Sequence, residues 1–281
     1  MVDRPPSTRE VWTSDERTEI LRRNAERNAA ASAEEARVLL DSAGLAPGQT
    51  VLDLACGPGD PTLDAAARVG PTGRVVGCDL SEGALEVARE RAGRAGLTNV
   101  EFRVATAEAL PFGAGSFDRY LCRFGMMFFE ELDRACAEAR RVLRPDGRLA
   151  AMVWGPWRQP YFLATVGVVM EAAGLRELSA LQKVPFRFAE PGPLETALVE
   201  AGFADVRAET RTVDWIFRGT PEEARDQWWA STVLWRPLVD SLPPFERPSV
   251  RAEVASRLKP FYDGVVLRVP ETVRVVTATG R

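Results

Sequence analysis

Residues 46–154 alternate short apolar segments with helical patterns, and this alternation constrains the fold more than any other feature of the chain. The apolar segments predict strands because they are short and bounded by turn residues. The predicted strands are residues 51–55, 74–79, 100–105, 117–123 and 148–154, and the predicted helices are residues 61–68, 82–94 and 130–143. Strands and helices that alternate at this spacing form a parallel sheet with helices on both faces. The chain is therefore predicted to be an α/β protein.

The segments on either side of this core are helical or rich in aromatic residues. Residues 14–43 carry apolar side chains at helical spacing and predict one long helix with a break near Asn28. Residues 206–217 predict a strand, and the C-terminal sequences VVLRV and TVRVVTAT predict an antiparallel edge strand. The expected regions are an N-terminal helical cap at 1–45, the core at 46–155, and the remaining strands with an aromatic helical cap at 156–281, mainly 156–190 and 221–262.

Histidine is absent from all 281 residues, and its absence removes whole classes of active site. A Ser-His-Asp triad, a Cys-His dyad, a histidine base and a histidine-ligated metal are all excluded. Lysine occurs only at Lys183 and Lys259, so a phosphate-binding loop with its lysine has no candidate. No group of carboxylates resembles a metal site either, and we expect no metal.

Charge and cysteine content indicate the compartment and the partners. The net charge is −4, which leaves no basic excess for binding nucleic acid. The four cysteines form no CxxC pair and are expected to be buried, as in a reducing compartment. The N-terminus has no apolar signal sequence, and no apolar run is long enough to span a membrane. We therefore expect a cytoplasmic protein whose partner is a small molecule, and its oligomeric state, monomer or homodimer, stays open.

The sequence VLDLACGPGDPT at 51–62 carries the strongest functional signal. A buried strand leads directly into Gly57-Pro58-Gly59, where the backbone can approach a ligand beside a helix N-terminus. The dinucleotide fingerprint G-x-G-x-x-G lacks its third glycine, because residue 62 is threonine. Asp79 closes the second strand, where a carboxylate can accept hydrogen bonds from ribose hydroxyls, although NAD sites use the same arrangement.

Four further sequences follow in register: ATAEALPF at 105–112, SFD at 116–118, CRFGMMFF at 122–129 and RVLRPDGRL at 141–149. Together with the D-x-x-x-G-x-G pattern from Asp53 to Gly59, they make residues 46–154 resemble the class I S-adenosylmethionine-dependent methyltransferases. The resemblance is to the small-molecule branch that includes the ubiquinone and menaquinone biosynthesis enzymes. It implies a Rossmann-like, mostly parallel sheet of seven strands with an antiparallel edge strand and helical cap insertions.

The resemblance also implies the cofactor S-adenosylmethionine and the residues that bind it. The implied cofactor site comprises Asp53, Ala55, Cys56, Gly57, Pro58, Gly59, Asp79, Leu80, Thr106, Ala107, Glu108, Arg123 and Phe124. One departure concerns the adenine, because relatives commonly have an acid where this chain has Thr106. A hydroxyl can still accept one hydrogen bond, although an uncharged acceptor is weaker. Glu108 either substitutes for that acid or is a solvated acid in a turn.

The catalytic candidates are Arg123 and Tyr161, and the chain must work without a histidine base. Methyl transfer is an in-line displacement that depends on alignment, and a base is needed only if the acceptor must lose a proton. An Asp, a Glu, Tyr161 or Tyr262 could be that base. Arg123 could stabilise an ionised acceptor, or could instead form a salt bridge to a neighbouring helix. The predicted acceptor pocket comprises Trp12, Met127, Trp154, Trp157, Trp228 and Trp229.

These observations predict a methyltransferase that acts on an oxygen, nitrogen or carbon atom of a small apolar or aromatic acceptor. One alternative keeps S-adenosylmethionine but uses it for non-methylating chemistry, as a decarboxylase or cyclase. A second alternative is an NAD-dependent oxidoreductase, and a third is a binding protein without turnover. The acceptor and its pathway stay open.

Overall fold

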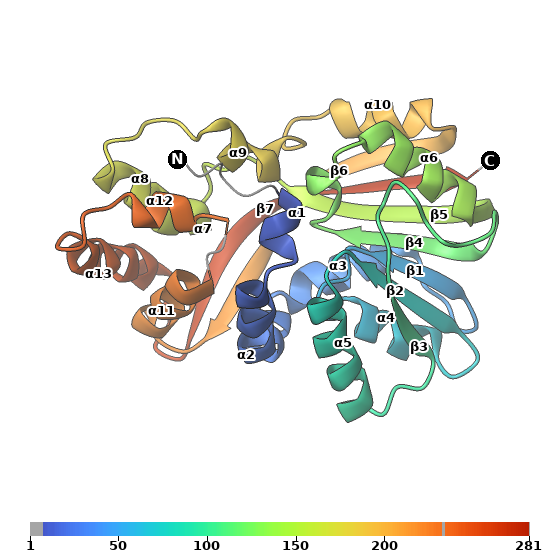
Figure 1. Ribbon diagram of the computed structural model, residues 1–281, viewed down its shortest axis with the longest axis horizontal. Helices are drawn as coiled ribbons and strands as arrows, with labels where there is room; N and C mark the ends of the chain where they lie inside the picture. The colour runs from blue at the N-terminus through green and yellow to red at the C-terminus, as the bar shows by residue number, and fades with distance from the viewer. Residues whose placement is uncertain (1–7, 232–233, 281) are drawn as a thin grey trace.

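The computed structural model describes residues 8–231 and 234–280, and these residues form one seven-stranded sheet (Figure 1). The strand order is β3-β2-β1-β4-β5-β7-β6, and the first five strands in this order are parallel. The strands are β1 (Thr50–Leu54), β2 (Arg74–Asp79), β3 (Val100–Val104), β4 (Phe117–Arg123), β5 (Leu143–Trp154), β6 (Phe203–Arg218) and β7 (Val266–Gly280). The predicted α/β fold with a mostly parallel sheet is confirmed.

The position of the C-terminal strand differs from the prediction. β7 is antiparallel as expected, but it lies between β5 and β6, so the edge strand on that side is β6. The physical reason is burial: Val273 and Val275 pack into the core on one face of β7, and Val276 and Ala278 into the core on the other. A strand that is apolar on both faces belongs inside a sheet. β6 instead exposes many of its side chains, which suits an edge.

Helices cover both faces of the sheet (Figure 1). α3 (Ala33–Ala43) and α4 (Thr62–Val69) pack into one apolar core, and α6 (Leu132–Val142) and α10 (Pro193–Glu200) pack into the core on the opposite face. α5 (Glu82–Arg94) contacts β2 and β3. The helices have buried alanines at these contacts, which bring them close to the strands.

The N-terminal segment consists of α1 (Thr8–Trp12) and α2 (Asp15–Ala31), followed by α3. The break in the long predicted helix falls at Ser32 rather than near Asn28, because Ser32 leaves helical geometry and ends α2. Its hydroxyl donates to the Asn28 carbonyl and accepts a hydrogen bond from Arg123. The break therefore ties the N-terminal helices to the end of β4.

A further apolar core lies beside the sheet, where the long strands β6 and β7 extend beyond their neighbours (Figure 1). Trp228, Val254 and Leu267 are among its buried members. The elements in this part of the chain are α7 (Pro160–Phe162), η2 (Leu163–Gly167), α8 (Val168–Ala172), α9 (Ala180–Lys183), η3 (Val184–Phe186), α11 (Pro221–Ser231), α12 (Arg236–Asp240), α13 (Arg247–Leu258) and η4 (Lys259–Phe261), and η1 (Met126–Phe128) follows β4. Because β6 and β7 contribute residues to this core and to the cores on both faces of the sheet, the boundary predicted at residue 155 stays a prediction.

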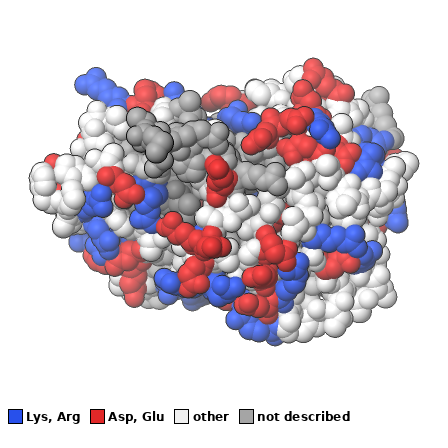
Figure 2. All heavy atoms as spheres, in the orientation of Figure 1, with Lys and Arg blue, Asp and Glu red and all other residues white. Residues whose placement is uncertain are grey.

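The surface carries both signs of charge. Figure 2 shows acidic and basic side chains interspersed over the face in view, without one broad basic patch. Within the part of the chain that the structure describes, no helix has both the length and the apolar character needed to cross a bilayer.

Candidate active site

A cavity of about 750 Å³ opens at the carboxyl ends of β1, β2 and β4, below the N-terminal helices and the helical cap. The ends of parallel strands are where open α/β sheets bind ligands, and this volume suits a small-molecule site. The predicted cofactor residues that line it are Ala55, Cys56, Gly57, Pro58, Asp79, Leu80, Thr106, Ala107, Glu108, Arg123 and Phe124. Two predicted residues, Asp53 and Gly59, do not line it.

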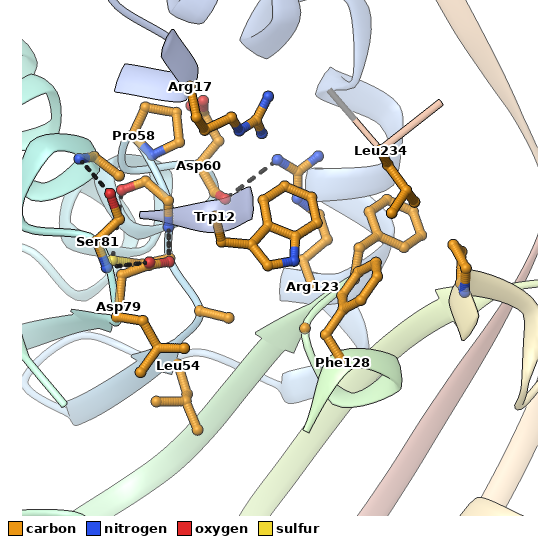
Figure 3. Close-up of a pocket in the computed structure, with 18 of the residues that line it drawn as sticks. Trp12, Arg17, Leu54, Pro58, Asp60, Asp79, Ser81, Arg123, Phe128 and Leu234 are labelled. Atoms are coloured by element: carbon orange, nitrogen blue, oxygen red, sulfur yellow. Dashed lines mark hydrogen bonds between the residues drawn. The ribbon is translucent and has the colours of Figure 1, made fainter. Parts of the chain in front are cut away.

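The loop after β1 presents backbone to the cavity. Gly57 has a φ of 52°, a conformation that side chains disfavour, and a Cβ added there would meet nothing within 4 Å. Its N–H donates to Asp79 Oδ2 at 2.9 Å, and the Ser81 N–H donates to Asp79 Oδ1 at 3.0 Å (Figure 3). Burial raises the pKa of Asp79, while these backbone donors and the Arg17 charge oppose the rise. Each carboxylate oxygen keeps a lone pair for a further donor.

Asp53 lies beneath this loop rather than beside the cavity. The Thr62 hydroxyl donates to its Oδ2 at 2.5 Å, which joins the end of β1 to the start of α4. Its Oδ1 has no hydrogen-bond donor among the described residues, and burial raises the pKa of Asp53 to about 7. Gly59 packs against Ala88 and Leu63, with a φ of 102°. Both residues therefore shape the loop from below.

Thr106, Ala107 and Glu108 form the opposite wall of this end of the cavity. The Thr106 carbonyl accepts a hydrogen bond from the Ala109 N–H at 3.3 Å, which closes a tight turn. Glu108 is half-buried and lines the cavity. The position of Glu108 favours an acid that faces a bound ligand over a solvated acid in a turn.

Arg123, at the end of β4, is held by three different segments. Its Nη1 donates to Ser32 Oγ at 2.8 Å and to Glu35 Oε2 at 3.3 Å, and its Nη2 donates to the Asp60 carbonyl at 3.2 Å (Figure 3). The salt bridge to a neighbouring helix is therefore present, and the partner is Glu35 of α3. The guanidinium also lines the cavity. It links the loop of β1 to the N-terminal helices.

Glu35 meets a second carboxyl group, Glu271 of β7, and both side chains line the cavity. Both residues are about 1% exposed, and the two carboxyl groups are within hydrogen-bonding reach of each other. Burial raises the pKa of both, and Glu271 more so, because Arg123 stabilises the charge on Glu35. Two buried carboxyl groups in contact hold one proton between them.

Tyr161 lies next to this acid pair, which is defined as Glu35 and Glu271. Burial and the two acids raise the pKa of Tyr161 above its ordinary value. A phenol in this environment stays protonated at neutral pH, so it can donate a hydrogen bond but is a poor base. Tyr262 does not line the cavity, and its hydroxyl donates to the Gly264 carbonyl at 2.8 Å.

Aromatic side chains form much of the remaining wall. Of the predicted acceptor residues, Trp12, Trp154 and Trp228 line the cavity. Met127 is fully buried, Trp229 lies under Arg251, and Trp157 lines a separate depression beneath Arg158. The cavity has further aromatic residues that the sequence analysis did not select: Phe128, Phe129, Phe162, Trp215 and Trp235.

The comparisons with known proteins agree with this architecture. Residues 51–147 match the family model "Methyltransferase domain". The chain is 32% identical over 255 residues to nocamycin O-methyltransferase of Saccharothrix syringae, a match that covers 86% of this chain and 89% of that enzyme. It is 35% identical over 170 residues to demethylmenaquinone methyltransferase of Lactococcus lactis, covering 57% of this chain and 67% of that enzyme. The chain belongs to the S-adenosylmethionine-dependent methyltransferases.

Solved structures of this methyltransferase family share the fold. Phosphoethanolamine N-methyltransferase 2 of Haemonchus contortus, crystallised with S-adenosyl-L-methionine, superposes with a TM-score of 0.61 at 17% identity. The match covers 98% of this chain and 60% of that one. Membership of the family makes S-adenosylmethionine the cofactor and sets aside the dinucleotide oxidoreductase alternative.

The residues of this methyltransferase fit that cofactor. The open position at Gly57 leaves space for a ligand against the loop backbone, and Asp79 offers a half-buried carboxylate to a pair of hydroxyls. Arg17 of α2 also reaches this end and stacks over Trp12 at 4.9 Å. Burial lowers the pKa of Arg17 to about 10, and its Nε has no acceptor among the described residues.

The sequence analysis did not select seven charged residues that line the cavity: Arg17, Glu35, Asp60, Glu130, Glu131, Arg134 and Glu271. Glu271 is an acid between VVLRV and TVRVVTAT, the two valine-rich sequences that were predicted as strand, and this signal could have singled it out. Arg17 and Glu35 lie in helices that carry many charges, where one buried charge has no local signature.

Proposed function

We propose that this chain transfers a methyl group from S-adenosylmethionine to a hydroxyl oxygen of a small, largely apolar acceptor. The observation that carries the proposal is the single cavity of about 750 Å³ that Asp79 and the acid pair both line, with aromatic side chains between. A cavity of this size has room for a nucleoside cofactor and a small acceptor together.

Two observations favour oxygen over carbon or nitrogen. The match to an O-methyltransferase covers 86% of the chain, whereas the match to the menaquinone enzyme covers 57%. The cavity also contains an acid pair that can take up a proton, and a hydroxyl acceptor must lose its proton to become a neutral methyl ether.

Different residues of the chain would bind the cofactor, exclude water and align the two reactants. Asp79, Gly57 and Glu108 would hold the cofactor, which supplies an electrophilic methyl group when it is bound. The aromatic walls exclude water and suit a positive charge that is being dispersed. Arg123 fixes the β1 loop and α3 in one arrangement, so that cofactor and acceptor are aligned.

A labelled methyl group tests this function. Purified protein is incubated with S-adenosylmethionine that carries a deuterated methyl group and with a panel of small hydroxylated aromatic compounds. The expected product gains one labelled methyl group on oxygen, located by mass spectrometry and NMR. Label found only on carbon or nitrogen contradicts the oxygen assignment, and a product without label supports decarboxylation or cyclisation instead.

A further inference from the structure

Glu271 is a buried acid with an uncommitted oxygen at the wall of the cavity. It is about 1% exposed and lies on β7 among valines. Its Oε2 receives no hydrogen bond from any described residue. A buried carboxylate oxygen without a donor is costly, so a donor is expected to come from a ligand in the cavity.

Charged and titratable groups from three elements surround Glu271. Glu35 contacts it from α3, where Glu34 is the preceding residue. Arg123 faces Glu35 from β4, and Tyr161 lies on α7. One positive charge among two carboxyl groups favours a single negative charge on the pair. At neutral pH the pair therefore holds one proton and can accept another.

The other acids at the cavity are less suited to accept a proton. Asp79 already receives two backbone N–H groups. Asp60 binds the Arg91 guanidinium through both oxygens, at 2.8 and 3.0 Å. Glu130 and Glu131 are exposed, and Glu108 is half-buried at the cofactor end. The acid pair differs from each of these five because it consists of two buried carboxyl groups in contact and because Glu271 Oε2 receives no hydrogen bond from any described residue.

We propose that Glu35 and Glu271 together form the general base of the reaction, and this inference rests on the proposed transfer to a hydroxyl oxygen. The acceptor oxygen forms its bond to the methyl carbon while the carbon–sulfur bond breaks and its electron pair stays on sulfur. The acceptor proton moves to the acid pair, which becomes neutral as the positive charge on sulfur is lost. The net charge of the cavity is unchanged, so the step requires no further ion.

The test compares Glu271→Gln and Glu35→Gln with Glu34→Gln, a neighbouring acid that does not line the cavity. Turnover is measured against pH with hydroxylated arenes of graded acidity, from 4-nitrophenol to 4-methoxyphenol. Glu271→Gln is expected to lower turnover of the weakly acidic arenes roughly 100-fold. The loss should be much smaller for 4-nitrophenol, which ionises without help. Glu34→Gln should match the wild type.

Two readouts separate a base from a structural role. The affinity for S-adenosylhomocysteine, measured by calorimetry, should change less than about threefold, since Asp79 is untouched. Infrared spectroscopy of the wild type should show a protonated carboxyl band that both pair variants lose. Three results would overturn the proposal that the acid pair is the general base. They are an equal loss of turnover for all arenes, wild-type turnover in Glu271→Gln, and the absence of this band. A wild type that methylates no hydroxyl contradicts the proposed function itself.

Discussion

The two ends of the cavity are built from different kinds of groups. The cofactor end consists of short loops after β1, β2 and β3, and its polar contacts are largely backbone N–H groups gathered around Asp79. The acceptor end consists of side chains that come from α1, α3, β7 and α11. The backbone groups are positioned by the strands that they follow. Side chains from distant segments come into contact only when the whole chain has folded.

The carboxylates of the two ends differ in the same way. Asp79 is satisfied by two backbone donors before any ligand binds, while Glu271 Oε2 has none among the described residues. A satisfied carboxylate serves binding, because its position is fixed. An unsatisfied one is available to take a proton. Changes at Asp79 should therefore act on affinity, and changes at the acid pair on turnover.

Arg123 joins the two ends, and its removal should have the largest effect. Arg123→Met leaves Glu35 without its cation and should lower the free energy of unfolding by about 3 kcal/mol, as expected when a buried ion pair loses one partner. Adding Glu35→Gln should restore part of that loss. Denaturant unfolding measures both, and Arg257→Met, which removes an exposed ion pair, should cost less than about 1 kcal/mol. If Arg123→Met and Glu35→Gln had additive effects on the free energy of unfolding, the proposed coupling between the two side chains would be contradicted.

Asp79→Ala should weaken binding of S-adenosylhomocysteine roughly 100-fold, as expected for the loss of two charge-assisted hydrogen bonds. Calorimetric titration measures the affinity directly. Glu82→Ala removes an exposed acid at the start of the adjacent helix and should leave the affinity unchanged. An unchanged affinity in Asp79→Ala would remove the basis for placing the cofactor hydroxyls at this residue.

Asp53 predicts a pH dependence of stability at the cofactor end. Its pKa is raised by burial to about 7, so the folded chain binds its proton more tightly than the unfolded chain does. The stabilisation is fully present below pH 4 and is lost as the pH rises through 7. Asp53→Asn should remove this dependence, which amounts to about 2 kcal/mol between pH 4 and pH 6, measured by denaturant unfolding. Parallel pH profiles for the two proteins would show that Asp53 is ionised throughout.

Trp228 and Trp229 offer the smallest but most closely matched comparison. Both are 8% exposed, yet Trp228 lines the cavity and Trp229 lies under Arg251 at 5.3 Å. Trp228→Phe should raise the KM for the acceptor about fivefold, since it removes contact area from the wall. Trp229→Phe should leave KM unchanged. Both substitutions should lower the melting temperature by similar amounts. Equal effects on KM would show that the wall is not specific to Trp228.

Much of the cofactor end could be predicted from the sequence because its determinants are local. The strand that leads into Gly57 and the acid that closes β2 lie in short segments, and the bounds of β2 and β4 agree with the prediction. Asp53 is the exception. The sequence shows an acid in a strand before a glycine loop, but only packing shows that Thr62 takes its side chain beneath the loop.

The acceptor end could not be predicted in the same detail, because its determinants are tertiary. Aromatic residues occur on all sides of the cap segments, so the pattern does not tell which of Trp157, Trp228 and Trp229 faces the cavity. The contact between Glu35 and Glu271 depends on β7 entering the sheet between β5 and β6. That strand order is set by burial on both faces of β7 and has no local signal.

A crystal structure with S-adenosylhomocysteine tests the division of the cavity most directly. We predict that the ribose hydroxyls donate to Asp79 and that the sulfur atom faces the space bounded by Arg123, Glu35 and Glu271. A cofactor whose ribose lies away from Asp79, or whose sulfur points away from the acid pair, would contradict this account.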